Sequence, residues 1–362
     1  MALPLDLARR IQGETPGDAW RTVLDYAWSV CAEPIAIDSP TKEVMRRERE
    51  LHPLDLYLAT AAYDMWAQME SCAPRNTKAL ASWWSQGGPG RAVLILDALS
   101  LREVPWILHA APKLGYTVQS ARVHVSEMPG ETTPFAKALG FAQRSSLESN
   151  GAGSGHCFPG AKTECVGIPW AEAAAYVTSD PDFVLWHHWP DDRVDSGNAN
   201  LESLAKEAAQ QLSGKDFWYL VQRLTTGRRL VVTSDHGYAA TGHFPLTEDE
   251  DQAKYLQQNF KSGRVASNGS PGPWIPPLDL QIQSEHGDRR IVLGRRKWKS
   301  PGGYPALAHG GLSILEVAVP FIELSRPETP CFLQPHDPTE RQRKNGSLKK
   351  SRKPSGQGGK SR

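Results

Sequence analysis

The spacing of apolar residues changes near residue 88. Before that point, Asp18 to Val30 and Leu51 to Met69 repeat apolar residues every three or four positions, which predicts amphipathic helices. Asn76 is placed to cap a short helix that reaches Trp83-Trp84, and glycine and proline at 86–90 then interrupt the pattern. Residues 1–88 are therefore expected to form a helical, tryptophan-rich region.

After residue 88 the pattern predicts strands that alternate with helices. Ala92 to Leu96 is an uninterrupted apolar run, typical of a strand buried on both faces of a parallel sheet. The other expected strands are 117–125, 183–186, 230–233 and 317–324, and the expected helices are 101–113, 132–139 and 201–225, the last broken near Ser213-Gly214. This alternation predicts an α/β fold layered around a central, mostly parallel sheet.

Three further segments complete the predicted organisation. The glycine- and serine-rich stretch 145–160 is expected to be a loop, and 246–305 an insertion or cap over the sheet. The last 24 residues carry nine basic residues and one acid, a net +8, and the rest of the chain is −7. We therefore divide the chain into a helical region (1–88), a layered domain (89–330) and a disordered basic tail (331–362).

Composition narrows the class of protein. A hydrophobic content of 40% and a charged content of 22% are ordinary for a globular protein. No apolar run reaches the roughly 20 residues that cross a bilayer, and the acidic first twenty residues do not resemble a signal peptide. The five cysteines are odd in number and widely spaced. These features predict a cytoplasmic protein with reduced thiols and no membrane association.

Acidic residues follow two of the predicted strands. Asp97 comes directly after the first strand, and Asp235-His236-Gly237 comes after 230–233. Ligands of open α/β sheets lie beyond the carboxyl ends of the strands, so these side chains are expected at one edge. Taken alone, Asp97 is better explained by capping of the next helix. A Ser-Asp-His-Gly sequence also occurs by chance in many chains.

A hydroxyl and a second imidazole are candidates for the same edge. Thr132 and Thr133 stand at the start of a predicted helix, where threonine is a good N-cap and where an anion is stabilised. A threonine alkoxide there would be an activated nucleophile. His309 precedes two glycines that allow close backbone approach, although a lone histidine is more often structural.

Together these segments resemble the PglZ family of the alkaline phosphatase superfamily. The resemblance rests on Asp97-Ala98-Leu99, Pro129 with Thr132, 234–237, and 309–313 followed by 316–320, and it covers about residues 90–325. It implies an alkaline-phosphatase-like layered sandwich with two divalent metal ions and Thr132 as the nucleophile. It also implies that Asp97, Thr132, Asp235 and His236 hold one ion, and that His309 serves the other.

The remaining ligands of the second ion are where this chain departs from the family. Asp191 matches the aspartate that the resemblance implies, but Asp195 stands four residues later, where the family has histidine. Either Asp195 replaces that histidine, or His187 or His188 reaches the site, or the site is weak or lost. The resemblance implies Zn²⁺, whereas an added carboxylate shifts the preference towards Mn²⁺ or Mg²⁺.

Other candidate groups are weaker. Arg102 lies five residues after Asp97 and is a candidate for contacting a phosphate, although a solvated helix position is the commoner role for such a residue. Arg228-Arg229 and 295–299 are further clusters of positive charge. The second mixes cations with an aromatic ring, which suits a nucleic-acid backbone and base stacking, but basic loops without a partner are commoner. Residues 157–161 begin like the modification sequence of sulfatases but lack its arginine, which excludes that class.

Our leading hypothesis is a metal-dependent phosphodiesterase or nuclease that acts on nucleic acid or an oligonucleotide. The resemblance implies a role in bacterial phage exclusion, alongside other defence-system proteins. The basic tail fits a polyanionic substrate. The alternatives are a phosphomonoesterase and a catalytically degenerate scaffold that binds partners, the latter favoured by Asp195 and by the twelve tryptophans.

Overall fold

A six-stranded mixed sheet forms the centre of the molecule. The computed structural model describes residues 2–88, 90–260, 262–266, 274, 276–299 and 306–326. The strands lie in the order β2-β13-β5-β1-β4-β3, and β13 alone runs against the other five. Their bounds are β1 Gly90–Leu96, β2 Thr117–Val125, β3 Lys162–Val166, β4 Asp182–His187, β5 Arg228–Thr233 and β13 Ala318–Ser325. The predicted α/β class with a mostly parallel sheet is confirmed.

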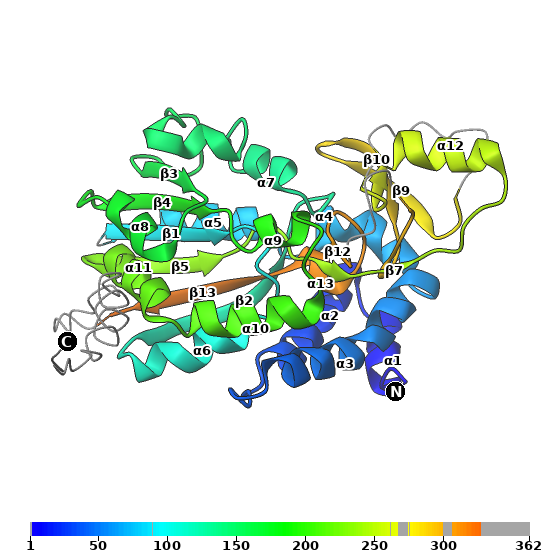
Figure 1. The fold of residues 1–362 in the computed structure, drawn as a ribbon, viewed down its shortest axis with the longest axis horizontal. Coiled ribbons are helices and arrows are strands. Elements are labelled where there is room, and N and C mark those ends of the chain that lie inside the picture. Colours follow the sequence, from blue (N-terminus) through cyan, green and yellow to red (C-terminus); the bar gives the residue numbers. More distant parts are fainter. Residues whose placement is uncertain are drawn as a thin grey trace, which may run out of the picture.

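Helices cover both faces of this sheet (Figure 1). Alternate residues of β1 enter opposite cores: Ala92, Leu94 and Leu96 pack on one side, and Val93 and Ile95 on the other. The first core is shared with α1 Leu5–Gly13, α2 Pro16–Cys31, α3 Pro40–Thr60, α4 Met69–Cys72, α6 Val104–Lys113, α8 Trp170–Ala173, α10 Leu201–Leu212 and α11 Lys215–Thr225. The second is shared with α5 Asn76–Ser85, α7 Thr132–Ala138 and the short 3-10 segment η2 Arg144–Asn150. The N-terminal helices therefore belong to the same core as the sheet.

Most predicted elements match the structure, with differences at 51–69, at Asn76 and at β3 Lys162–Val166. The break predicted at Ser213-Gly214 separates α10 from α11. Residues 51–69 are not one helix, because α3 ends at Thr60 and a 3-10 segment, η1 Tyr63–Gln68, follows. Asn76 does not cap α5, since its side chain donates to Thr233 Oγ1 and to the Ser234 carbonyl, both at 2.9 Å. Strand β3 was not predicted.

The inserted segment builds a small unit of its own. It contains α12 Glu250–Asn259, the antiparallel strands β8 Val265–Ala266, β9 Asp279–Ser284 and β10 Gly287–Val292, and β11 Arg296–Lys297. A separate core of Phe244, Tyr255, Phe260, Val292 and Trp298 holds it together. It lies beside the carboxyl ends of the parallel strands, next to α3, rather than over a face of the sheet (Figure 1).

Short elements connect this unit to the sheet. Strand β6 Ala239–Ala240 pairs with β12 Leu307–Ala308, and β7 Gly242–His243 pairs with β11. Three other short elements flank the sheet: the 3-10 segment η3 Ala174–Tyr176 follows α8, the short helix α9 Asp191–Asp195 follows β4, and α13 Ile314–Val317 precedes β13.

The expected basic tail, 331–362, lies outside the described residues. Within the described part of the chain, none of the helices has the length and apolar character needed to cross a membrane.

Candidate metal centre

The carboxyl ends of three neighbouring parallel strands deliver most of the candidate ligands. Asp97 follows β1, Asp191 follows β4, and Asp235-His236 follow β5, and these strands lie in the order β5-β1-β4. Thr132 begins α7, and His309 follows β12. All the predicted site residues except Arg102 meet at this edge of the sheet.

The first cluster surrounds the Thr132 hydroxyl. Ligand atoms of Asp97, Asp235 and His236 all lie within 4.8 Å of one another, and all three residues are buried. Thr132 Oγ1 lies 3.3 Å from Asp97 Oδ1 and 3.3 Å from His236 Nε2. Thr133 lines the adjacent cavity and is exposed. The structure therefore distinguishes the two threonines, because the Thr132 hydroxyl touches the carboxylate and the imidazole.

Outer hydrogen bonds orient these ligands. Asp97 Oδ2 accepts from Trp186 Nε1 at 3.1 Å and from Arg144, so Oδ1 is the oxygen that faces Thr132. Asp235 Oδ1 accepts from the backbone N–H of Ala98 at 3.0 Å, and His236 Nδ1 donates to the Gly237 carbonyl at 3.0 Å. These hydrogen bonds leave one atom of each ligand directed at the cluster: Oδ1 of Asp97, Oδ2 of Asp235 and Nε2 of His236.

A second cluster lies next to the first. Ligand atoms of Asp191, His236 and His309 lie within 4.8 Å of one another, and the two imidazole rings stack with centroids 4.4 Å apart. His309 Nε2 is 3.8 Å from Asp191 Oδ1 and 3.5 Å from Asp195 Oδ1. The one-turn helix α9 brings both carboxylates to the same side, because residues four apart are neighbours on a helix.

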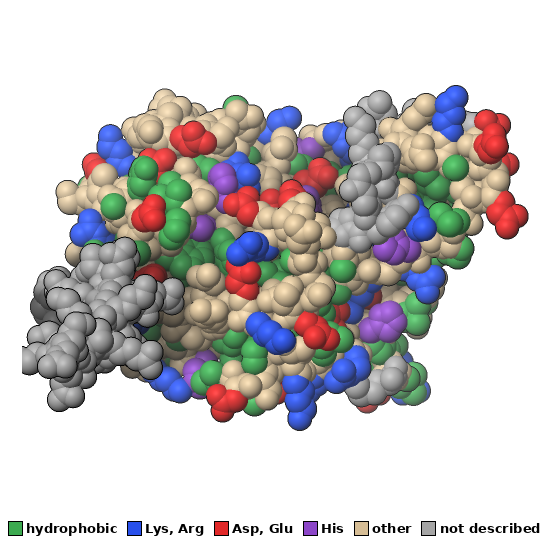
Figure 2. All heavy atoms as spheres, viewed as in Figure 1, with side chains coloured by type: hydrophobic (Ala, Val, Ile, Leu, Met, Phe, Trp, Pro, Cys, Tyr) green, Lys and Arg blue, Asp and Glu red, His purple; other side chains and the backbone are tan. Residues whose placement is uncertain are grey.

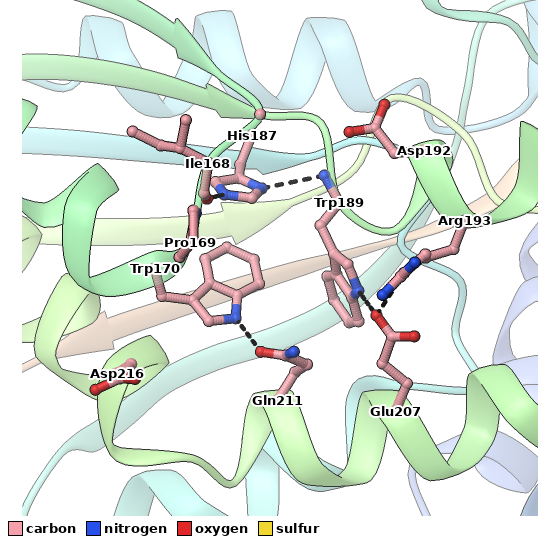
Figure 3. A pocket seen from close by; sticks show the side chains of 11 residues that line it. Ile168, Pro169, Trp170, His187, Trp189, Asp192, Arg193, Glu207, Gln211 and Asp216 are labelled. Carbon is pink, nitrogen blue, oxygen red and sulfur yellow. Dashed lines mark hydrogen bonds and ion pairs between the residues drawn. The ribbon is translucent and has the colours of Figure 1, made fainter. Parts of the chain in front are cut away.

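The two histidines considered as alternatives to Asp195 have other partners. His187 Nε2 donates to the Ile168 carbonyl at 2.8 Å, and its ring stacks on Trp170 with centroids 4.0 Å apart. Figure 3 shows this ring in a separate pocket, beside Trp170 and Trp189. His188 Nε2 lies 3.3 Å from Cys165 Sγ. Of the three candidates Asp195, His187 and His188, Asp195 is therefore the one that contacts His309.

Arg102 does not lie at the mouth of the site, which corrects the sequence-based expectation. Its side chain is fully buried and pairs with Glu48. It also donates to the Tyr238 carbonyl at 2.6 Å and to Ser100 Oγ at 2.8 Å. These partners hold the guanidinium inside the core, because a buried charge must be paired.

Arg144 is a site residue that the sequence did not reveal. It begins η2 and lies at the edge of the predicted glycine-rich loop, in no motif. Its guanidinium bonds Asp97 Oδ2 and lies 3.8 Å from Asp191 Oδ2. No periodicity or spacing in the sequence connects Arg144 with Asp97, so only the folded chain shows this contact.

The packing of carboxylates shifts their proton affinities. Burial raises the pKa of Asp97 to about 7, and the Asp235 charge adds to this, although His236 and Arg144 act against it. Burial also raises the pKa values of Asp235 and Asp191 to about 6. For His309, burial lowers the pKa, but the hydrogen bond to Asp195 and the Asp191 charge outweigh it and raise the pKa to about 10. Ionising all of these buried carboxylates is therefore unfavourable unless positive charge is added beside them.

Several ligand-type atoms fit a bound cation. Asp235 Oδ2, Asp191 Oδ1 and His309 Nδ1 are buried and have no hydrogen-bond partner within the described residues. Buried polar atoms are nearly always paired. Carboxylate oxygens and imidazole nitrogens are also the donors that Zn²⁺ and Mn²⁺ take. The residues present therefore fit divalent cations at the two clusters.

A cavity of about 390 Å³ opens beside the clusters. Its lining residues are Glu131, Thr132, Thr133, Gln143, Arg144, Ser145, Asp191, Asp195 and His309. Figure 2 shows acidic side chains in the upper middle of the molecule, over the region where Figure 1 places α7 and α9. A substrate could thus reach the Thr132 hydroxyl from this cavity.

Comparison with known proteins gives only distant likenesses. No protein-family model matches the chain. No curated protein matches either. Among solved structures, murine ectonucleotide pyrophosphatase/phosphodiesterase 5 is similar over 66% of this chain and 88% of its own, with 15% identity and a TM-score of 0.43. The human protein of that name gives the same coverages, 13% identity and a TM-score of 0.44.

Proposed function

We propose that the protein is a divalent-metal-dependent phosphodiesterase with Thr132 as its nucleophile. The observation that carries this proposal is the position of Thr132 Oγ1, 3.3 Å from both Asp97 Oδ1 and His236 Nε2, on the wall of an open cavity. A hydroxyl held between a carboxylate and an imidazole is an arrangement suited to nucleophilic attack.

Two groups of residues would hold the ions. Asp97, Asp235 and His236 would hold one, and Asp191, Asp195 and His309 the other. Two such ions would activate the attacking oxygen and stabilise negative charge on the leaving oxygen. We propose Zn²⁺, with Mn²⁺ or Mg²⁺ as the alternatives that the four carboxylates favour.

The Thr132 hydroxyl must lose its proton when it attacks phosphorus, and Asp97 is placed to accept it. The Thr132 hydroxyl donates to Asp97 Oδ1, so the proton that attack must release lies beside a carboxylate oxygen. A bond forms between Thr132 Oγ1 and phosphorus, the bond from phosphorus to the leaving alcohol breaks, and the alcohol takes up a proton. Water then cleaves the phosphothreonine, releases a phosphomonoester and restores the hydroxyl.

The substrate and the biological role rest on the motif resemblance to the PglZ family. That resemblance supports a nucleic acid or oligonucleotide substrate and a place in a bacterial phage-defence assembly with other proteins. The basic stretch 295–299 adds little support, because Arg295 pairs with Glu48 and Asp55 and Lys297 is buried. Arg228 is likewise held by the Asp180 and Thr178 carbonyls.

Hydrolysis of bis(p-nitrophenyl) phosphate, assayed with added Zn²⁺, Mn²⁺ or Mg²⁺, tests the proposal. Thr132→Ala is expected to lower kcat by about 10³-fold or more, because it removes the nucleophile. Thr133→Ala is the matched variant next to it, and we expect a loss of less than about ten-fold.

Elemental analysis of the purified protein separates this enzyme from the competing scaffold hypothesis. About two bound ions per chain, together with activity that depends on Thr132, support the hydrolase. A chain without metal and without activity would instead favour the scaffold, in which Asp195 marks a site that has decayed.

A further inference from the structure

The cavity beside Thr132 has an unusual balance of charge. Among its lining residues, Arg144 is the one lysine or arginine. Glu131 lines the same cavity and directly precedes the nucleophile in the chain. Neither residue was among the ligands inferred from the sequence. A fixed cation and an additional carboxylate thus share the space where a substrate phosphoryl group would lie.

Arg144 keeps donors available for a substrate. Its Nη1 atom contacts Asp97 and lies 3.8 Å from Asp191, while a quarter of the side chain is exposed. A guanidinium carries five N–H donors in a planar fork. The donors that the two aspartates leave over can bind a non-bridging phosphoryl oxygen, in the way guanidinium groups bind phosphates elsewhere.

Glu131 lies on the His309 side of the cavity. A Cβ added at Gly310 would come 3.2 Å from Glu131 Oε1, so the carboxylate packs against the His309 loop. The Glu131 side chain is half-buried and lines the cavity. Its ionised carboxylate would repel a further negative charge on the substrate.

We infer that Arg144 and Glu131 together select the charge of the substrate. Arg144 binds one anionic oxygen, and Glu131 disfavours a second, so the cavity accepts the monoanion of a phosphodiester and rejects the dianion of a phosphomonoester. This inference rests on the proposed function and assigns its specificity to two residues outside the ligand set.

The uncharged residues of the cavity also favour a phosphodiester over a phosphomonoester. Thr133, Gln143 and Ser145 also line it, and each offers a hydrogen-bonding group without charge. A diester carries a second substituent on phosphorus that needs such a surface, whereas a monoester carries another charged oxygen. The cavity of about 390 Å³ has room for that substituent.

The test compares bis(p-nitrophenyl) phosphate with p-nitrophenyl phosphate at pH 8, using the full chain with added metal. We expect Glu131→Gln to raise kcat/KM for the monoester relative to the diester by about ten-fold, because it removes one repelling charge and keeps the shape. An unchanged ratio would overturn the inference.

Arg144 is tested with a pair of variants. Arg144→Gln is expected to lower kcat/KM for the diester by about 10- to 100-fold, mainly through KM, and Arg144→Lys should recover part of the loss because it keeps the charge. Equal losses in both variants, or a loss under two-fold in Arg144→Gln, would contradict a role in anion binding. Thermal melting identifies a variant that fails to fold, and the Glu131→Gln ratio remains decisive in that case.

The two proposals fail in different ways. If the Thr132→Ala protein remains fully active, the proposed hydrolase itself is wrong. If Thr132→Ala abolishes activity while Glu131→Gln leaves the ratio of monoester to diester hydrolysis unchanged, the chemistry stands and only the charge selection is wrong.

Discussion

At the scale of single residues, two glycines shape the edge of the sheet that carries the site. A Cβ at Gly237 would lie 2.2 Å from the Leu315 carbonyl oxygen, and a Cβ at Gly311 would lie 1.9 Å from Arg264 Nη2. The Arg264 side chain is buried and pairs with Glu316, which also accepts from the Gly311 N–H at 3.0 Å. The loop after His309 is therefore held by an arginine that occupies the space beside Gly311.

Gly311→Ala is expected to destabilise the protein by about 2–4 kcal/mol, because the added methyl group displaces the guanidinium and breaks a buried ion pair. The matched control is Gly155→Ala, where nothing lies within 4 Å of the added Cβ. Urea unfolding of both variants measures the free energy of unfolding. Equal stability of the two variants would contradict the packing argument.

The buried acids predict a pH dependence of the metal-free protein. Because burial raises the pKa values of Asp97 to about 7 and of Asp235 and Asp191 to about 6, the folded state binds more protons than the unfolded chain between about pH 4 and pH 7. Stability is therefore lost as the pH rises through this window. Bound cations should offset that loss.

Thermal melting with EDTA and with added Zn²⁺ checks this expectation. The rise in Tm that the metal produces should be larger at pH 8 than at pH 5, since protons compete with the metal for the same oxygens. In Asp235→Asn the difference between the two pH values should shrink. A metal effect that is equal at both pH values would count against the carboxylate clusters as the binding site.

At the scale of elements, the five-residue helix α9 directs its three aspartates to two different sides. Asp191 and Asp195 lie near His309, whereas Asp192 lies 3.9 Å from His188 on the other side. The i, i+4 spacing places the Asp191 and Asp195 carboxylates on the same side of α9, beside His309, which is the arrangement that the proposed second metal site requires.

Asp195→Ala should therefore reduce the bound metal from about two ions per chain to about one, with the carboxylate of the second site removed. Asp192→Ala is the control on the same helix and should keep the full metal content. Elemental analysis after gel filtration decides between them. If both variants bind the same amount of metal, Asp195 is not a ligand.

At the scale of the whole molecule, arginines tie the N-terminal helices and the inserted segment to the sheet edge. Arg295 of the inserted segment pairs with Glu48 and Asp55 of α3, and Asp55 Oδ1 accepts from the Ile314 N–H at 2.6 Å. Arg75 joins the buried Glu127 to Glu285 of the inserted segment. The three regions therefore stabilise one another around the site.

Arg295→Ala is expected to cost about 3 kcal/mol, because it leaves buried carboxylates with too few partners. Its neighbour Arg296 is exposed and provides the control, with an expected change within about 0.5 kcal/mol. Urea unfolding distinguishes the two. A similar cost for both variants would show that the inserted segment is not anchored through Arg295.

The sequence by itself was sufficient for five of the six strands of the central sheet, all but β3, and for the candidate ligands that follow two of them. A strand buried on both faces is a continuous apolar run, as in β1, where Ala92 to Leu96 are all buried. The partly exposed β2 was predicted with its observed bounds, Thr117–Val125. The candidate ligands Asp97, Asp235 and His236 could be found because they stand within three residues of the ends of apolar strands, where parallel strands end at a common edge.

Only the tertiary structure decided which arginines lie at the site. Arg102 was a candidate for contacting the substrate, with a solvated helix position as the alternative, yet it is buried and pairs with Glu48, 54 positions earlier in the chain. Arg144 was overlooked, yet it bonds Asp97, 47 positions away. Long side chains take their partners from whatever segments the packing brings within reach, and no local period in the sequence encodes those partners. Local patterning therefore determined the framework, and the packing of distant segments determined its charges.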